Sequence, residues 1–128
     1  MLEIIDKINQ DSYAKHLGIK PEEVRWGYAK CSVRITGDML NSDGISHGGL
    51  IFSLADVAFS AASWSIKMSV AINISGSFFK PAKSGDILIS EAKLVRATKQ
   101  FGNFNIEVKK EEDLIAAFNG TAFKVESR

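Results

Sequence analysis

Apolar and polar residues follow one another along this chain in two rhythms, one helical and one extended. Residues 2–9 space their leucine and isoleucines as an amphipathic helix does, and residues 12–17 are expected to continue it up to Gly18. Residues 28–36 instead alternate strictly, which predicts a half-buried strand. Its apolar face holds Ala29, Cys31, Val33 and Ile35.

A long helix is predicted from about His47 to Lys67. It follows residues 37–46, where Gly, Asp, Asn and Ser occur at the density of a turn. Ser46 is the expected N-cap. The segment is apolar nearly all round, which is typical of a buried helix.

Only strands are indicated after this helix. Residues 70–78 alternate, and further strands are predicted over 86–97, around 103–109 and over 114–125. Short connections join these four strands, so each is expected to pair antiparallel with the next. The first strand is expected to turn one set of apolar side chains to the same face: Val70, Ile72, Ile74 and Phe78.

These elements together predict an α+β fold in a single domain spanning residues 1–128. An apolar helix without a helical partner must be buried against the sheet. The expected architecture is therefore an antiparallel sheet wrapped around one long central helix.

Composition and charge exclude several classes of function. The chain has 16 basic and 15 acidic residues, a net charge of +1, so it lacks the basic excess of a nucleic-acid-binding protein. Its one cysteine, Cys31, cannot form an internal disulfide. The first ten residues include acids and no apolar core, unlike a signal peptide. The most hydrophobic stretch, residues 48–66, contains Asp56 and many small residues, unlike a membrane span. We expect a cytoplasmic protein with no membrane or nucleic-acid partner.

The long helix carries one acid, Asp56, on a stripe of small and polar residues. The members of this stripe lie within about 60° of Asp56 on a helical projection: Gly49, Ser53, Ser60, Ser63 and Lys67. One interpretation is a contact between helices, with the serines permitting close approach. The other is a catalytic site, because a partly desolvated carboxylate has a raised pKa that suits a general base.

His47 bears on that choice. It precedes Asp56 by nine residues, about 900° of rotation and roughly 13 Å of rise, so the two side chains point to opposite sides. If both serve one site, that site combines His47 of one subunit with Asp56 of a two-fold-related partner. The protein must then be at least a homodimer.

The start of the helix can itself stabilise an anionic oxygen. Its unpaired backbone N–H groups lie at the positive end of the helix dipole. Gly48 and Gly49 have no side chains, so a substrate carbonyl could come close to these donors, as in an oxyanion hole. The alternative is that the glycines only allow a tight turn into the helix.

Residues 41–56, NSDGISHGGLIFSLAD, resemble the signature N-x-x-G-x-x-H-G-G-x-x-x-x-L-x-D of PaaI-type hot-dog thioesterases. This family is related to phenylacetate-degradation and 4-hydroxybenzoyl-CoA thioesterases. HLGI at 16–19 and SFFKPAKSGD at 77–86 are also similar to family segments. The resemblance implies a hot-dog fold, an acyl-CoA substrate, hydrolysis of its thioester, and tetramers built from dimers.

The resemblance also implies roles for four residues. The N–H of Gly48 would polarise the thioester carbonyl, and Asp56 of the facing subunit would act as general base or as nucleophile. Asn41 would orient the water or the thioester sulfur, unless it is only a turn residue. His47 would fix the loop and Asn41 without shuttling protons. No metal or cofactor is expected, and no helper serine or threonine can be assigned within residues 69–73.

Coenzyme A carries phosphates and an adenine, so cations are expected near the mouth of the site. Lys80, Lys83, Arg96 and Lys99 lie in or beside two turns, although each could equally be a solvated surface charge. Aromatic side chains such as Phe78 could line the acyl pocket or belong to the core. The predicted substrate-binding residues are Gly49, Phe79, Lys80, Pro81, Arg96 and Lys99. A small aromatic or a medium-chain acyl group would fit.

Two other functions remain as alternatives. A hot-dog hydratase or dehydratase pairs a histidine with an acid in proline-rich surroundings, but Pro21 and Pro81 both lie away from His47. A non-catalytic acyl-CoA-binding protein would not need Asp56. Thiol release from acyl-CoAs separates these functions from a thioesterase.

Overall fold

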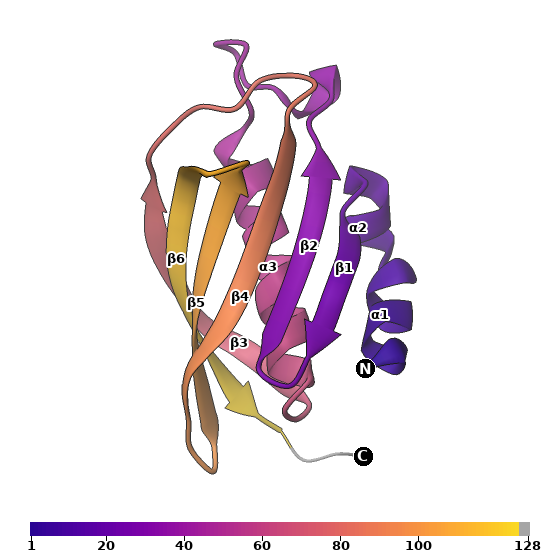
Figure 1. The fold of residues 1–128 in the computed structure, drawn as a ribbon, viewed down its shortest axis with the longest axis vertical. Helices are drawn as coiled ribbons and strands as arrows, with labels where there is room; N and C mark the ends of the chain where they lie inside the picture. Colours follow the sequence, from indigo (N-terminus) through magenta and orange to yellow (C-terminus); the bar gives the residue numbers. More distant parts are fainter. Residues whose placement is uncertain (126–128) are drawn as a thin grey trace.

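The computed structural model describes residues 1–125 as one curved sheet around a central helix (Figure 1). Six antiparallel strands form the sheet in the order β1-β2-β4-β5-β6-β3. The elements in chain order are α1 (Leu2–Asn9), α2 (Ser12–Leu17), β1 (Lys20–Arg25), β2 (Tyr28–Arg34), a 3-10 turn (Gly37–Met39), α3 (Gly48–Trp64), β3 (Ser69–Phe78), β4 (Ile87–Ala97), β5 (Phe101–Lys110) and β6 (Asp113–Lys124).

Helix α3 lies against the concave face of the sheet, as its apolar sequence predicts. Leu54 and Phe59 are almost fully buried, and the hydroxyl of buried Ser90 on β4 donates to the carbonyl of Leu54 at 3.0 Å. Gly120 on β6 leaves the space that the Phe59 ring occupies, because a Cβ built on Gly120 would lie 2.8 Å from that ring. The central helix and the sheet therefore share one core.

The N-terminal segment forms two helices where a single continuing helix was expected. Asp11 interrupts the chain between them and caps α2, since its side chain accepts the N–H of Ala14 at 2.9 Å. Gly18 ends α2 with a φ of 78°, a left-handed conformation that glycine adopts without strain. The predicted end of this segment is confirmed.

Strand β1 was missed in the sequence because its residues are polar. Of KPEEVR only Val24 is buried. The strand forms one edge of the sheet and pairs with β2, and α1 packs beside it. Because β1 lies at the edge of the sheet and is mostly exposed, it does not need alternating apolar residues.

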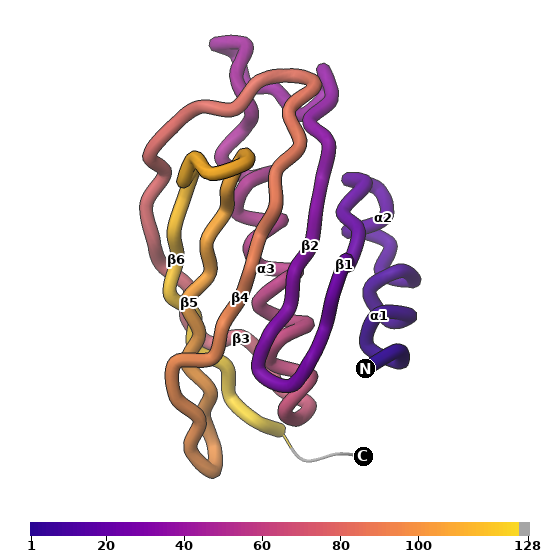
Figure 2. Tube along the Cα trace, viewed as in Figure 1, coloured from indigo at the N-terminus to yellow at the C-terminus, as the bar shows by residue number. Residues whose placement is uncertain are grey.

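The prediction that β3 pairs with β4 is wrong. β3 pairs with β6, and residues 79–86 cross over the end of the sheet to reach β4 (Figure 2). The expected alternation of β3 also fails at a bulge between Ala71 and Asn73. The bulge adds one residue, so Val70 lies on the opposite face from Ile74 and Phe78. The pairing of β4, β5 and β6 in sequence is confirmed.

Strand β3 forms the second edge of the sheet and is largely uncovered. Several of its apolar side chains are more than half exposed, and no element of residues 1–125 pairs with its outer edge. The exposed large apolar residues on or beside it are Met68, Val70, Ile72, Phe78 and Phe79. Within the same residues, no helix is both long and apolar enough to cross a membrane.

The contact between Gly120 and Phe59 gives a first prediction. Gly120→Ala should lower the free energy of unfolding by about 1–3 kcal/mol, because the added methyl group overpacks the core. Urea unfolding measures this difference. Gly37→Ala is the control, since a Cβ there would have no atom within 4 Å. Equal stability of both variants would contradict the packing described.

Candidate functional site

His47 caps the start of α3, a position that the sequence assigned to Ser46. The Nδ1 atom of His47 accepts the N–H of Gly49 at 2.9 Å. An accepting Nδ1 places the proton of the neutral ring on Nε2. The Ser46 N–H instead donates to the carbonyl of Ala82 at 2.7 Å, which ties this loop to the crossover segment.

Gly48 keeps the one uncommitted N–H group of the first helical turn. The N–H groups of Leu50 and Ile51 donate to the carbonyl of His47 at 3.0 and 3.4 Å, and that of Gly49 donates to the imidazole. Among residues 1–125 nothing accepts the N–H of Gly48. The positive end of the helix dipole thus presents a single free donor.

Asn41 shapes the loop before α3 and leaves its own donor free. Its Oδ1 accepts the N–H groups of Asp43 at 2.9 Å and Ile45 at 3.3 Å, so the turn interpretation is correct for this oxygen. No partner of Nδ2 lies within the described chain, and His47 makes no hydrogen bond to Asn41 there. The Asn41 amide can therefore still donate to a ligand.

A pocket of about 360 Å³ brings several predicted residues together. It opens between the loop before α3, the start of α3 and the end of β3. A Cβ on Gly48 would lie 3.5 Å from the Phe78 ring, so Gly48 faces this side. The lining residues are Asn41, Ile45, Ser46, Gly48, Ile51, Phe78, Phe79, Lys80 and Pro81.

Asp56 lies elsewhere on α3, on the side that the sheet leaves uncovered. It is half-buried, and no hydrogen bond or ion pair to its carboxylate occurs within residues 1–125. Burial, and next the charge of Asp11, raise the pKa of Asp56. Eight residues separate it from Gly48, about 12 Å along the axis, so one chain does not bring the two together.

A second pocket, of about 300 Å³, opens beside Gly49 and His47. Helix α2 forms its wall, and the sequence did not indicate this contact. The hydroxyl of Tyr13 on α2 is 2.9 Å from the hydroxyl of Ser53 on α3. No local pattern reveals a bond between residues forty positions apart.

The predicted cations are not gathered at one place. Lys80 lines the Gly48 pocket and lies 3.3 Å from the carboxylate of Asp113 in an exposed ion pair. Arg96 and Lys99 belong to the β4–β5 hairpin, at the opposite end of the sheet from segment 79–86 (Figure 2). These two can serve the Gly48 pocket only from another subunit.

Ser69 and Cys31, to which the sequence analysis gave no role in the site, have structural roles. The hydroxyl of Ser69 bonds to that of Ser63 on the stripe, and both residues are buried. Burial raises the pKa of the Cys31 thiol to about 12, so the cysteine is not a reactive nucleophile. Within the described chain no group of three acids, histidines or cysteines could hold a metal ion.

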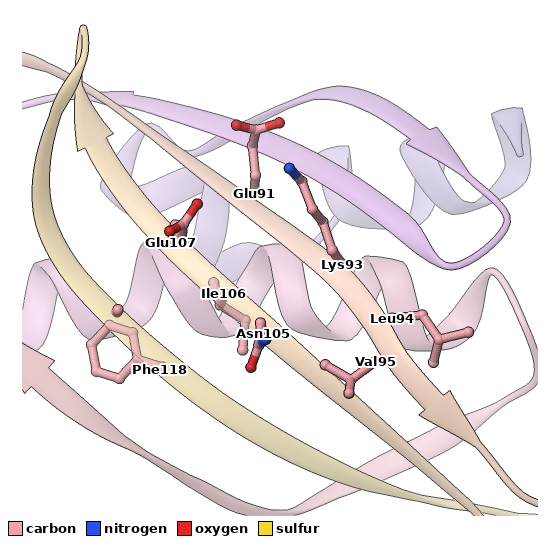
Figure 3. Close-up of a pocket in the computed structure, with 9 residues that line it drawn as sticks. Glu91, Lys93, Leu94, Val95, Asn105, Ile106, Glu107 and Phe118 are labelled. Atoms are coloured by element: carbon pink, nitrogen blue, oxygen red, sulfur yellow. The ribbon is translucent and has the colours of Figure 1, made fainter.

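The outer face of the sheet has a pocket of its own. Figure 3 shows it in front of α3, with Glu91 and Lys93 on β4 and Asn105 and Glu107 on β5. None of the predicted site residues lines it. The pocket on the outer face is therefore separate from the residues that the sequence predicted for the site.

Comparison with known proteins decides the family. A family model described as the thioesterase superfamily matches residues 43–117, more than half of the chain. The chain belongs to the thioesterase superfamily. The prediction of a thioesterase from the signature at residues 41–56 is thus confirmed at the level of the family.

Sequence relatives support this assignment to the superfamily. The acyl-coenzyme A thioesterase PaaI of Escherichia coli is 35% identical over 117 residues, covering 90% of this chain and 84% of its own. A protein of Archaeoglobus fulgidus named as an esterase is 40% identical over 105 residues, covering 80% and 68%.

Solved structures of the superfamily confirm the hot-dog fold. The E. coli PaaI structure has a TM-score of 0.92 at 32% identity and covers 95% of this chain and 90% of its own. A variant of the phenylacetic acid degradation protein PaaI of Thermus thermophilus has a TM-score of 0.88 at 30% identity, covering 90% and 100%.

The environment of Asp56 gives a second prediction. The folded state binds more protons than the unfolded state between the ordinary aspartate pKa of 3.8 and the raised pKa, so stability falls as the pH rises through this interval. Asp56→Asn should therefore be more stable than the wild type near pH 7. The difference in unfolding free energy should shrink near pH 3, where both states hold the proton. A difference independent of pH would contradict the raised pKa.

Proposed function

We propose that this protein is an acyl-CoA thioesterase whose site combines the start of α3 in one subunit with Asp56 of the partner subunit. The observation that carries this proposal is a pair of uncommitted groups in one chain. They are the N–H of Gly48 and the half-buried carboxylate of Asp56, about 12 Å apart along the axis of α3 and about 80° apart around it. An oxyanion donor and a base act on one carbonyl only if two copies meet.

Two uncovered features of the chain support such a meeting. Strand β3 has a free edge with exposed apolar side chains, which is a template for pairing with a second copy. The stripe on α3 contains Gly49 and Ser60, which are not buried within the chain and whose small size permits close approach of another helix. A two-fold axis beside β3 would bury both features and bring Asp56 to the partner's helix start. The stripe would then be both a contact between helices and the place of a catalytic carboxylate.

The reaction follows from these positions. The thioester carbonyl oxygen accepts the N–H of Gly48, and Asp56 of the partner subunit takes a proton from water as the water oxygen attacks the carbonyl carbon. The helix dipole stabilises the resulting oxyanion. The carbon–sulfur bond then breaks, coenzyme A leaves and takes a proton, and a carboxylic acid remains. Direct attack by Asp56, through a mixed anhydride, is the second route.

Asn41 and His47 support this chemistry in different ways. The free Nδ2 of Asn41 lines the Gly48 pocket and can donate to the water or to the thioester sulfur. His47 holds the first turn of α3 through Gly49 and so aims the N–H of Gly48. No proton transfer by His47 is needed.

The coenzyme A arm would lie along Phe79, Lys80 and Pro81 in the Gly48 pocket. A two-fold axis reverses the direction of the sheet, so Arg96 and Lys99 of the partner subunit would approach the same end and meet the phosphates. We further propose a cytoplasmic enzyme that assembles as a dimer of dimers. Its acyl group would be small and aromatic, as in phenylacetic acid degradation, or of medium chain length.

A matched pair of variants tests the donor at Gly48. Gly48→Pro removes this N–H and adds a ring at the first helical position, where proline is well tolerated after an extended residue such as His47. Gly48→Ala keeps the N–H and adds a methyl in ordinary contact with Phe78. Thiol release from acyl-CoAs should fall about 10²–10³-fold in kcat for Gly48→Pro. It should fall far less for Gly48→Ala, and equal losses would reject the donor role.

Mixed dimers test the shared site. Asp56→Asn and Gly48→Pro should each be nearly inactive alone. A dimer purified with one subunit of each kind contains one complete site of two, so it should recover about half of the wild-type thiol release. An inactive mixed dimer, or an active Asp56→Asn homodimer, would overturn the proposal.

A further inference from the structure

The start of α3 lies between two pockets. Gly48 faces the pocket with Asn41 and Lys80, whereas Gly49 faces the second pocket, beside α2. A thioester has two arms that leave its carbonyl carbon in different directions. A carbonyl bound at the N–H of Gly48 could therefore send one arm into each pocket. This reasoning rests on the proposed function.

We propose that the acyl arm enters the pocket beside α2, and that Tyr13 determines which acyl groups this pocket accepts. The pocket has a volume of about 300 Å³, enough for a small ring or a short chain. It is lined by Tyr13, His16, Leu17, Asp38, Met39, Leu40, His47, Gly49 and Leu50.

The chemistry of the two pockets assigns the arms. Leu17, Met39, Leu40 and Leu50 give the α2 pocket apolar walls, which suit an uncharged acyl group. Its one carboxylate, Asp38, would repel a phosphate. The Gly48 pocket also has apolar walls, from Ile51, Phe78 and Phe79, but it is lined by a lysine and by no carboxylate. The charges of the two pockets therefore assign the phosphate-bearing arm to the Gly48 pocket.

Tyr13 is held in place by a directed pair of hydrogen bonds. The Ser53 hydroxyl is 2.8 Å from the carbonyl of Gly49 and donates its single proton to it. Ser53 must therefore accept from the hydroxyl of Tyr13, 2.9 Å away. The aromatic ring is thus tied to the helix turn that contains Gly48 and Gly49.

The exposure of Tyr13 indicates that the core does not need this ring. Tyr13 is 59% exposed, so packing alone would not order it. Its hydroxyl bond fixes an otherwise solvated aromatic ring at the wall of a pocket next to the reacting carbonyl. An acyl group in the pocket would contact the ring, and aromatic acyl groups would gain most.

The test compares acyl groups and not only rates. Thiol release is measured with acetyl-, hexanoyl-, benzoyl- and phenylacetyl-CoA, and kcat/KM for the best of the larger groups is divided by that for acetyl-CoA. Tyr13→Ala should lower this ratio about tenfold, because the larger group loses its contact with the ring. Tyr13→Phe keeps the ring but loses the bond to Ser53 that holds it in place, so the ratio should fall, by less than in Tyr13→Ala.

Trp26→Ala is the matched control. Trp26 lies in the turn between β1 and β2, is 62% exposed and lines neither pocket, so the ratio should not change. Inhibition by the free carboxylic acid should weaken in Tyr13→Ala, whereas inhibition by free coenzyme A should stay the same.

Two results would overturn the assignment of Tyr13. One is an unchanged ratio in Tyr13→Ala, which includes an equal fall for every acyl group, and the other is weakened inhibition by coenzyme A alone. Failure of the proposed function looks different, because the wild type itself would then release no thiol from any of the four substrates.

Discussion

The rest of this structure depends on the fact that its apolar central helix, α3, is only partly covered. α3 is apolar almost all round, yet a single sheet can cover only part of it, and α1 and α2 shield a further part. On the stripe, Gly49 is exposed and Asp56 and Ser60 are half-buried, and the outer edge of β3 is also uncovered. The proposed second subunit and the proposed catalytic role of Asp56 both rest on this one deficit.

The unpaired carboxylate on that stripe lowers stability, and the function that we propose would account for its presence. Asp56 has no cationic or hydrogen-bonding partner among the residues described, and its burial disfavours the charged form. A charge kept in such surroundings is costly for a folded chain but useful for a base that must work near neutral pH. The neighbouring carboxylate of Asp11 acts in the same direction.

At the start of α3, in contrast, nearly every backbone N–H group has a hydrogen-bond partner, and only that of Gly48 is left free. His47 occupies the N–H of Gly49, and its carbonyl accepts from Leu50 and Ile51. Asn41 likewise uses its oxygen for the loop and keeps its amide nitrogen. The remaining donors are held by a rigid framework, which is the condition for stabilising a developing negative charge.

Much of this protein was determined by local patterns. The helix at residues 48–64 and the strand at 28–34 follow from side-chain periodicity, which depends only on backbone geometry. The same helical arithmetic predicted that His47 and Asp56 face different ways. The signature at residues 41–56 pointed to the correct superfamily.

Tertiary structure decided what depends on distant contacts. Three features were not predicted: the pairing of β3 with β6, the polar strand β1 and the bulge after Ala71. Each depends on which strands and helices pack against the segment, and not on its local propensity. The cap at His47 and the bond from Tyr13 to Ser53 need loops folded against α3. Periodicity encodes which face of an element is buried, but only packing determines what lies against it.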